Sequence, residues 1–280
     1  MSSVPVPTVT ASPAPTVTVP PVTAPDVSVV VVAYGTGPIL IDSLESLVAT
    51  TTSSDLSVEL IVVSNPHPMA GRRSATELRL FTAGVRLVEP DRNVGFGGGC
   101  ELGALVARGD VLAFVNPDVI ARPGWLEPLV AVVRTAAAPT IAAPVLLEPD
   151  GRVQEAGQAV ASDGTTHALT ERPTSGSVVD VDYASAACWV MRRADHETLG
   201  GFDASYHPAY FEDVDLAWRC HRADGRCVVV AASSVVHDRG RGTPEQAAPA
   251  DAQRDLFLRR WPEVTWLDPQ ANSRSTSIRA

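Results

Sequence analysis

Three carboxylates stand within four positions in the second half of the chain, at Glu212, Asp213 and Asp215. Two aromatic residues, Tyr210 and Phe211, precede them, and an apolar helical pattern follows. A carboxylate held at the mouth of a pocket can act as a general base that activates a hydroxyl group. The same residues also suit the first turn of a helix, where unpaired N–H groups and the helix dipole favour negative charge. The motif by itself leaves both explanations open.

The elements that must position these acids begin with a regular alternation of strands and helices. The strands are predicted at Val27–Tyr34, Val58–Val63, Val85–Val88 and Val111–Val115. Three helices are predicted between these strands. The first follows the turn Gly35–Pro38 and carries Leu40, Leu44, Leu47 and Val48 on one face, the second spans Ser74 to Thr82, and the third spans about Gly98 to Arg108. Such an alternation indicates an α/β fold: one nucleotide-binding, Rossmann-like domain with a mostly parallel sheet flanked by helices.

Polar or turn residues stand where the predicted strands end. These groups are Ala33-Tyr34, Ser64-Asn65, Arg92-Asn93 and Asn116-Pro117-Asp118. In open α/β sheets ligands bind beyond the carboxyl ends of the strands, so we expect these residues to bind the ligand. Asp118 could hold a divalent cation that bridges a diphosphate, although an Asn-Pro-Asp segment is also common as a simple turn. His237 follows a predicted strand and could be either structural or a metal ligand.

The glycine-rich segment Asn93-Val94-Gly95-Phe96-Gly97-Gly98-Gly99 superficially resembles a dinucleotide-binding fingerprint. It lacks that pattern, because Cys100 stands where the third small residue belongs and the segment follows the third strand instead of the first. The glycines could let the backbone approach a ligand, with Gly95 among the contacts, and leave N–H groups available at a helix start. A tight turn is the competing explanation.

The second half of the chain is less regular. We expect a helix from Pro123, strands over Ala184 to Met191 and Arg226 to Ala231, and an amphipathic segment over Ala247 to Trp261. The domain is expected to span residues 26–265, between a disordered leader rich in Pro and Thr (residues 1–25) and a flexible tail (residues 266–280).

Composition restricts the partners. A formal net charge of −10 and a pI of about 5.0 argue against a nucleic-acid surface and a polybasic membrane anchor. The four cysteines have no zinc or redox spacing and are expected to be reduced thiols. No apolar run has the length of a membrane span, and no signal peptide is evident, so a cytoplasmic location is expected, with at most peripheral contact at the inner face of the membrane.

Several of these motifs occur together and in one order. They are Val29 to Tyr34, Asn93 to Gly99, Phe114 to Asp118, Pro123-Gly124-Trp125-Leu126, Gly200-Gly201-Phe202-Asp203, Phe211 to Leu216 and Val236-His237. With them, the chain resembles the inverting family 2 glycosyltransferases of the GT-A fold, and most closely the bacterial rhamnosyltransferase-like branch.

The resemblance implies a role for each motif. Asp118 would ligate Mg²⁺ or Mn²⁺ beside the donor diphosphate, and His237 would supply a further metal or diphosphate contact. Asp213 would be the catalytic base, with Glu212 as its neighbour, and Gly201-Phe202-Asp203 would lie near the acceptor. The implied donor is a nucleotide sugar, with a deoxyhexose such as rhamnose on dTDP as the first expectation. The implied acceptor is a glycan, a lipid-linked glycan or a small molecule.

The chain departs from the family pattern at Gly35, at Ser64 and at Cys100-Glu101, all on the donor side. Two other functions stay open at this level. A nucleotidyltransferase would carry a basic, glycine-rich loop after the first strand, which Tyr34 to Pro38 does not provide. A non-catalytic sugar- or partner-binding module would tolerate loss of Asp213.

Overall fold

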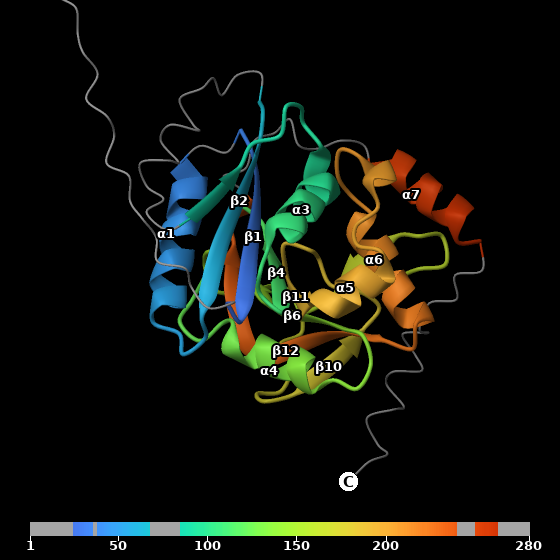
Figure 1. Ribbon diagram of the computed structural model, residues 1–280. Coiled ribbons are helices and arrows are strands. Elements are labelled where there is room, and N and C mark those ends of the chain that lie inside the picture. Colours follow the sequence, from blue (N-terminus) through green and yellow to red (C-terminus); the bar gives the residue numbers. More distant parts are fainter. Residues whose placement is uncertain (1–24, 36–37, 68–84, 240–249, 263–280) are drawn as a thin grey trace, which may run out of the picture.

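The computed structural model describes residues 25–35, 38–67, 85–239 and 250–262 (Figure 1). Residues 1–24 of the expected leader, the whole expected tail and the helix expected at residues 74–82 lie outside these ranges. Among the described residues, no helix is both long enough and apolar enough to cross a membrane.

A mixed sheet forms the centre of the molecule, with the strand order β10-β12-β6-β11-β4-β1-β2-β3. Their bounds in this order are Val178–Val181, Arg226–His237, Thr140–Leu147, Cys188–Arg192, Val111–Val115, Val27–Tyr34, Val58–Asn65 and Val85–Val88. Two short strands join its side, with β5 (Val119–Ile120) pairing with β12 and β7 (Val153–Glu155) pairing with β6. A separate hairpin consists of β8 (Gln158–Val160) and β9 (Thr166–Ala168).

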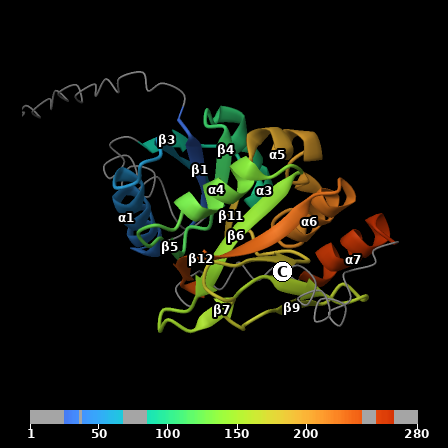
Figure 2. The same cartoon turned by 90° about the horizontal axis from the view of Figure 1, so that it is seen from below.

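Helices cover both faces of this sheet (Figures 1 and 2). Leucines of α1 (Pro38–Thr52) and α4 (Glu127–Thr135) belong to one core cluster with Val27, Val29 and Val31 of β1. On the opposite face, α3 (Gly95–Val106) packs against Val30 and Val32, and α6 (Glu212–Arg222) lies over β6 and β12. Burial on both sides explains why β1 is a nearly continuous run of β-branched residues, as the sequence predicted.

The sheet is parallel from β3 to β4, and there β11 enters in the opposite direction. It is antiparallel to both β4 and β6. The strand expected over Ala184 to Met191 is therefore shorter and later than predicted, because residues 184–187 form a turn before Cys188. That turn is held by backbone contacts, including Asn116 N–H to the Ala187 carbonyl at 2.8 Å.

Two helix starts differ from the sequence prediction. The helix expected from Pro123 begins at Glu127, because Gly124 has φ of 76° and a turn closes from Arg122 to Trp125. The glycine-rich segment is helical from Gly95, where a loop was expected up to Gly98. Val48 is also displaced from its expected buried face and is 43% exposed. At 100° per residue it lies about 80° from Leu40 around α1, at the edge of the buried stripe.

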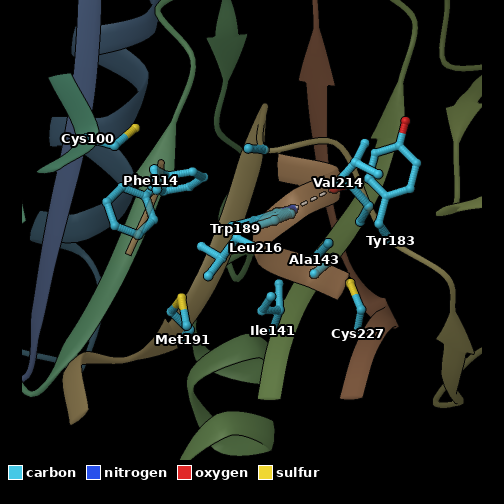
Figure 3. Close-up of a cluster of buried hydrophobic side chains, with 14 of the residues drawn as sticks. Cys100, Phe114, Ile141, Ala143, Tyr183, Trp189, Met191, Val214, Leu216 and Cys227 are labelled. Atoms are coloured by element: carbon cyan, nitrogen blue, oxygen red, sulfur yellow. Dashed lines mark hydrogen bonds between the residues drawn. The ribbon is translucent and has the colours of Figure 1, made fainter. Parts of the chain in front are cut away.

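The glycines of α3 allow the helix to approach the sheet closely. A Cβ added to Gly99 would lie 2.6 Å from the Val32 side chain, and one added to Gly103 would lie 2.2 Å from that of Val30. Both distances are shorter than any normal carbon contact, so larger residues would force the helix away from β1. Beneath α3 and α6, Phe114 and Trp189 belong to the largest fully buried side chains of the core (Figure 3).

The amphipathic segment near the C-terminus forms α7 (Ala250–Arg260), which packs beside α6 (Figure 1). Phe257 is fully buried, with its ring centroid 5.7 Å from that of Phe211. Leu256, Leu258 and Trp261 pack partly buried against the same core. This apolar stripe therefore stabilises the acidic helix from behind and faces the protein interior.

Candidate active site

A cavity of about 330 Å³ lies at the carboxyl ends of β1, β2 and β4. Seven residues predicted to bind the ligand line it: Tyr34, Asn65, Asn93, Gly95, Asn116, Pro117 and Asp118. The cavity is also lined by Ser185, Ala186, Ala187, Pro208, Ala209, Tyr210, Glu212 and Asp213. The structure thus brings the motif after β4 and the motif at the start of α6 into one space.

Three other predicted binding residues are not among those that line this cavity: Ala33, Ser64 and Arg92. Ala33 belongs to the core on the α1 side, and Val32 lines the cavity in its place because successive residues of a strand face opposite sides. Arg92 is exposed.

Asp118 and His237 form the candidate metal-binding pair. The strand predicted before His237 is β12, which runs from Arg226 to His237 itself with an irregularity in pairing between Val230 and Ser234. The end of β12 pairs with β5, where His237 lies opposite Val119. This pairing brings His237 Nε2 to 3.2 Å from Asp118 Oδ1.

The surroundings of this pair fit a cation. Asp118 Oδ1 is buried and accepts no hydrogen bond, so an electron-rich oxygen is directed at the space beside the imidazole. Carboxylate and imidazole are suitable ligands for Mn²⁺, and Mg²⁺ commonly takes one or two carboxylates together with substrate phosphates. Among the described residues, no group of three or more His, Cys, Asp or Glu side chains could hold a metal. A cation at Asp118 and His237 would therefore need further ligands from a bound diphosphate or from water.

Asp213 lines the same cavity as Asp118. Its Oδ1 accepts a hydrogen bond from the Val214 N–H at 2.9 Å, and its Oδ2 accepts one from the Ala186 N–H at 3.3 Å. Withdrawal from water raises the pKa of Asp213 to about 6, against the lowering effect of these two N–H groups, and the nearby Glu155 charge adds to the rise. A carboxylate with this pKa is well placed to take a proton near neutral pH.

Glu212 differs from its neighbour in that Oε2 is buried and without a hydrogen-bond partner. Burial, followed by repulsion from Asp213, raises the pKa of Glu212 well above its ordinary value. Repulsion across the pair favours a single negative charge, and the two backbone donors favour Asp213 as its holder. The tertiary structure therefore assigns the two adjacent acids different environments.

The backbone before the acids is unusual. Tyr210 and Phe211 both have positive φ, at 78° and 67°. This conformation is costly for aromatic residues and is retained where the surroundings enforce it, often at functional sites. It turns Phe211 into the core beside Phe257, whereas Tyr210 lines the cavity and stays 40% exposed.

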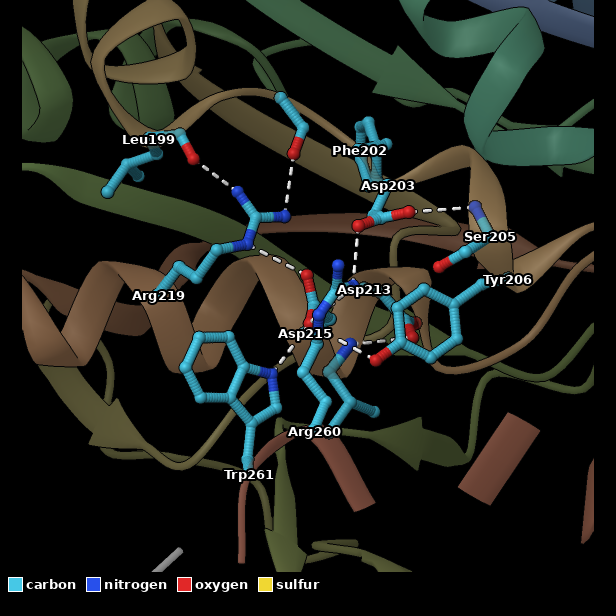
Figure 4. A network of polar contacts seen from close by, with 12 residues as sticks. Leu199, Phe202, Asp203, Ser205, Tyr206, Asp213, Asp215, Arg219, Arg260 and Trp261 are labelled. Carbon is cyan, nitrogen blue, oxygen red and sulfur yellow. Dashed lines mark hydrogen bonds and ion pairs between the residues drawn. The ribbon is translucent and has the colours of Figure 1, made fainter. Parts of the chain in front are cut away.

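Asp215 points away from the cavity into a polar network between α6 and α7 (Figure 4). Its carboxylate is fully buried and accepts hydrogen bonds from Arg219 Nε and Trp261 Nε1, each at 2.8 Å, and from the Tyr206 hydroxyl at 3.1 Å. Asp215 follows Asp213 by about 200° around the helix, so the two acids face opposite sides. The third carboxylate of the motif is thus structural.

We expect Asp215→Ala to lower the free energy of unfolding by about 3–5 kcal/mol, because it leaves the Arg219 charge without its buried partner. Urea unfolding checks this value. The matched control is Asp180→Ala, since Asp180 pairs with Arg226 on the surface with half of each side chain exposed. Such an exposed pair contributes about 0–1 kcal/mol. Equal losses for the two variants would contradict the structural role of Asp215.

The segment predicted to lie near the acceptor, Gly201-Phe202-Asp203, is not part of the cavity lining. Phe202 is buried, with ring centroids 5.7 Å from Trp189 and 5.1 Å from Phe114. Asp203 pairs with Arg260 of α7 at 2.5 Å. In this structure the segment packs the core and anchors α7.

Two residues of β7, Glu155 and Gln154, hold parts of the site in place and were not identified from the sequence. Glu155 of β7 accepts a hydrogen bond from the Ser185 N–H at 2.8 Å and thereby holds the turn that donates to Asp213. Its neighbour Gln154 contacts His237. Nothing in the local pattern around residues 153–155 marks these two side chains, because their partners are distant in sequence.

Comparison with known proteins places the chain among sugar transferases. The family model described as "Glycosyl transferase family 2" matches residues 28–200. The uncharacterized protein y4gI of Sinorhizobium fredii is 27% identical over 269 residues, which cover 89% of this chain and 29% of that protein. The O-antigen biosynthesis protein RfbC of Myxococcus xanthus is 28% identical over 59% of this chain, but only 14% of its own length is covered. The chain thus corresponds to a minor part of these two relatives.

A third relative is matched over most of its length. The N-acetylglucosaminyl-diphospho-decaprenol L-rhamnosyltransferase of Mycobacterium tuberculosis is 26% identical over 79% of this chain and 78% of that protein.

Among solved structures, GalNAc-T7 with UDP, GalNAc and Mn²⁺ has a TM-score of 0.69, and the match covers 85% of this chain and 48% of the GalNAc-T7 chain. The Pyrobaculum calidifontis mannosyltransferase PcManGT, with GDP-Man and Mn²⁺, has a TM-score of 0.56, covering 88% and 67%. Both are 16% identical to this chain, so they show the shared fold.

Proposed function

Because the chain belongs to glycosyl transferase family 2 and is a glycosyltransferase of the GT-A fold, we propose that it transfers a sugar from a nucleoside-diphosphate donor with inversion and with a divalent cation. The observation that carries this proposal is the shared cavity of Asp118 and Asp213. Asp213 can take a proton, and Asp118 can hold a cation near a diphosphate.

Asp213 is the general base in this proposal. It removes the proton of the acceptor hydroxyl as the oxygen attacks the anomeric carbon, while the bond from that carbon to the donor diphosphate breaks on the opposite side. A single displacement of this kind inverts the anomeric centre. A retaining reaction through a glycosyl-enzyme would need a separate nucleophile. Among the described residues that line the cavity, the carboxylates are Asp118, Glu212 and Asp213, and the raised pKa of Glu212 makes it a poor nucleophile.

Asp118 and His237 would hold Mg²⁺ or Mn²⁺. When bound, the cation would stabilise the negative charge of the departing nucleoside diphosphate. Tyr34, Asn65 and Asn93 lie where the donor would enter, and Asn65 is buried with its side chain bonded to the start of α3. These three residues would shape the donor pocket.

The donor and acceptor are proposed from the relatives. The mycobacterial relative is named for L-rhamnose transfer to a lipid-linked sugar diphosphate, which supports a deoxyhexose donor such as dTDP-rhamnose and a lipid-linked glycan acceptor. The match to glycosyl transferase family 2 argues against the nucleotidyltransferase and against the non-catalytic module as the function of this chain.

A screen of donors tests the proposal. Purified protein is mixed with dTDP-, UDP- and GDP-sugars with and without Mn²⁺, and its melting temperature and the release of nucleoside diphosphate are measured. We expect one donor to raise the melting temperature in a Mn²⁺-dependent manner, since a ligand bound only by the folded state stabilises it. An absence of both stabilisation and nucleoside-diphosphate release with every donor would contradict it.

The pH dependence of the rate should report the pKa of Asp213. Burial raises this pKa to about 6, so the base becomes protonated, and inactive, as the pH falls through 6. We expect kcat/KM at saturating Mn²⁺ to fall about tenfold per pH unit on the acid side. An Asp with an unperturbed pKa would keep its activity to about pH 4. A flat profile between pH 7 and 4.5 would therefore show that Asp213 is not the rate-determining base.

A further inference from the structure

Gln154, on the short strand β7, contacts both the backbone and the ring of His237. Its side chain is 7% exposed. Its Nε2 donates a hydrogen bond to the His237 carbonyl oxygen at 2.9 Å. Its Oε1 accepts hydrogen bonds from His237 Nδ1 at 2.9 Å and from Arg239 Nε at 3.0 Å. One amide group therefore holds both the backbone and the ring of the same histidine.

The identity of these partners determines which ring nitrogen carries the proton. A guanidinium can only donate, so the Gln154 atom that faces Arg239 must be the oxygen. The same oxygen faces His237 Nδ1, and an amide oxygen can only accept, so Nδ1 must carry a hydrogen. In the neutral ring the lone pair is then on Nε2, the nitrogen that lies 3.2 Å from Asp118 Oδ1.

Two lone pairs thus meet at Asp118, which lines the cavity, whereas His237 lies behind it and is not among the lining residues. Asp118 Oδ1 is buried without a hydrogen-bond donor, and His237 Nε2 has no hydrogen to offer it in this tautomer. A cation satisfies both atoms together. A ring free to adopt the other tautomer would instead donate Nε2–H to the carboxylate and close the site.

We infer that Gln154 is a positioning residue for the metal: it fixes the tautomer and the rotation of His237 so that Nε2 faces the cation shared with Asp118. The inference rests on the proposed divalent-metal site and adds the residue that prepares it. Residues that orient metal-binding histidines in this way typically change metal affinity 10- to 100-fold when replaced, as an order of magnitude.

Mn²⁺ binding tests the inference apart from activity. Free Mn²⁺ is followed by electron paramagnetic resonance during titration of the full chain with UDP or dTDP present. We expect Gln154→Leu to weaken Mn²⁺ binding about 10- to 100-fold relative to the wild type. The matched control is Gln158→Leu, since Gln158 donates to Glu155 and forms no hydrogen bond with His237, and the Mn²⁺ affinity of this variant should not change.

The tautomer gives a second readout that needs neither metal nor turnover. In protein labelled with ¹⁵N-histidine, with the His237 signals assigned through a His237→Gln variant, we expect a protonated Nδ1 and an unprotonated Nε2 in the wild type. Gln154→Leu should give a mixture of tautomers. Gln154→Glu keeps an acceptor for Nδ1–H and should keep the wild-type tautomer.

The outcomes separate the two proposals. Wild-type protein that binds no Mn²⁺ with either nucleotide would refute the metal site itself. Wild-type binding together with unchanged affinity in a folded Gln154→Leu variant would overturn the role of Gln154 alone. If Gln154→Leu does not fold, the wild-type spectrum still decides, because a proton on Nε2 would overturn the assignment.

Discussion

Replacing Asp213 by asparagine is expected to lower the rate of sugar transfer about 10²- to 10⁴-fold, the range that a general base contributes. Asparagine is nearly isosteric and can still accept a hydrogen bond from Val214 or Ala186, but it cannot take the proton of the acceptor hydroxyl. Removing a carboxylate that burial disfavours should leave the melting temperature at or above that of the wild type. The rate is measured as nucleoside diphosphate released at saturating donor and Mn²⁺.

The control for this variant is Asp224→Asn. Asp224 is exposed at the end of α6 and has φ of 56°, a conformation that asparagine adopts readily. Its rate should equal that of the wild type. Near-wild-type turnover by Asp213→Asn would remove Asp213 from the mechanism.

Replacing Asp118 by alanine is expected to abolish most of the cation-dependent rate, by about 10²- to 10³-fold, the loss typical of removing one preorganised group that stabilises a developing charge. Mn²⁺ affinity, measured by titration, should fall with it, because His237 would remain as the single side-chain ligand. Asp118 Oδ1 makes no hydrogen bond, so its removal should not destabilise the fold.

Asp110→Ala is the matched control, because Asp110 is exposed at the opposite end of β4. It should bind Mn²⁺ and transfer sugar as the wild type does. The two active-site variants should also differ from each other, since Asp213→Asn is expected to retain Mn²⁺ binding and Asp118→Ala to lose it. Unchanged Mn²⁺ affinity in Asp118→Ala would refute the assignment of the metal ligand.

The regular part of the fold could be predicted from the sequence. The β-branched run of β1 and the alternation of strands and helices are local signals, and they depend on burial of both sheet faces. Because ligands bind beyond the carboxyl ends of the strands in such sheets, Tyr34, Asn65 and Asp118 were predicted to lie together at that edge of the sheet. All three line the cavity. The antiparallel entry of β11 was missed, because pairing direction depends on where a distant segment returns.

The glycine-rich segment shows a different limit. Its composition predicted a loop, whereas Gly95 to Gly99 are the first turns of α3. Glycine disfavours a helix by about 1 kcal/mol relative to alanine, and local propensity therefore pointed the wrong way. Contact with Val30 and Val32 of β1 outweighs this preference, because a helix without Cβ atoms on one face can lie directly on the strand.

By itself, the sequence determined which residue types could do the chemistry: a cluster of acids, an aspartate after a central strand and a histidine after another. Only the tertiary structure decided the separate environments of the three acids. Asp213 accepts two backbone hydrogen bonds, Oε2 of Glu212 is buried without a hydrogen-bond partner, and Asp215 lies in an ion-pair network. The tertiary structure also decided that Gln154 holds His237 across 83 positions of the chain. Residue type and spacing are local properties, whereas burial, charge and hydrogen-bond partners are set by segments that meet only when the chain folds.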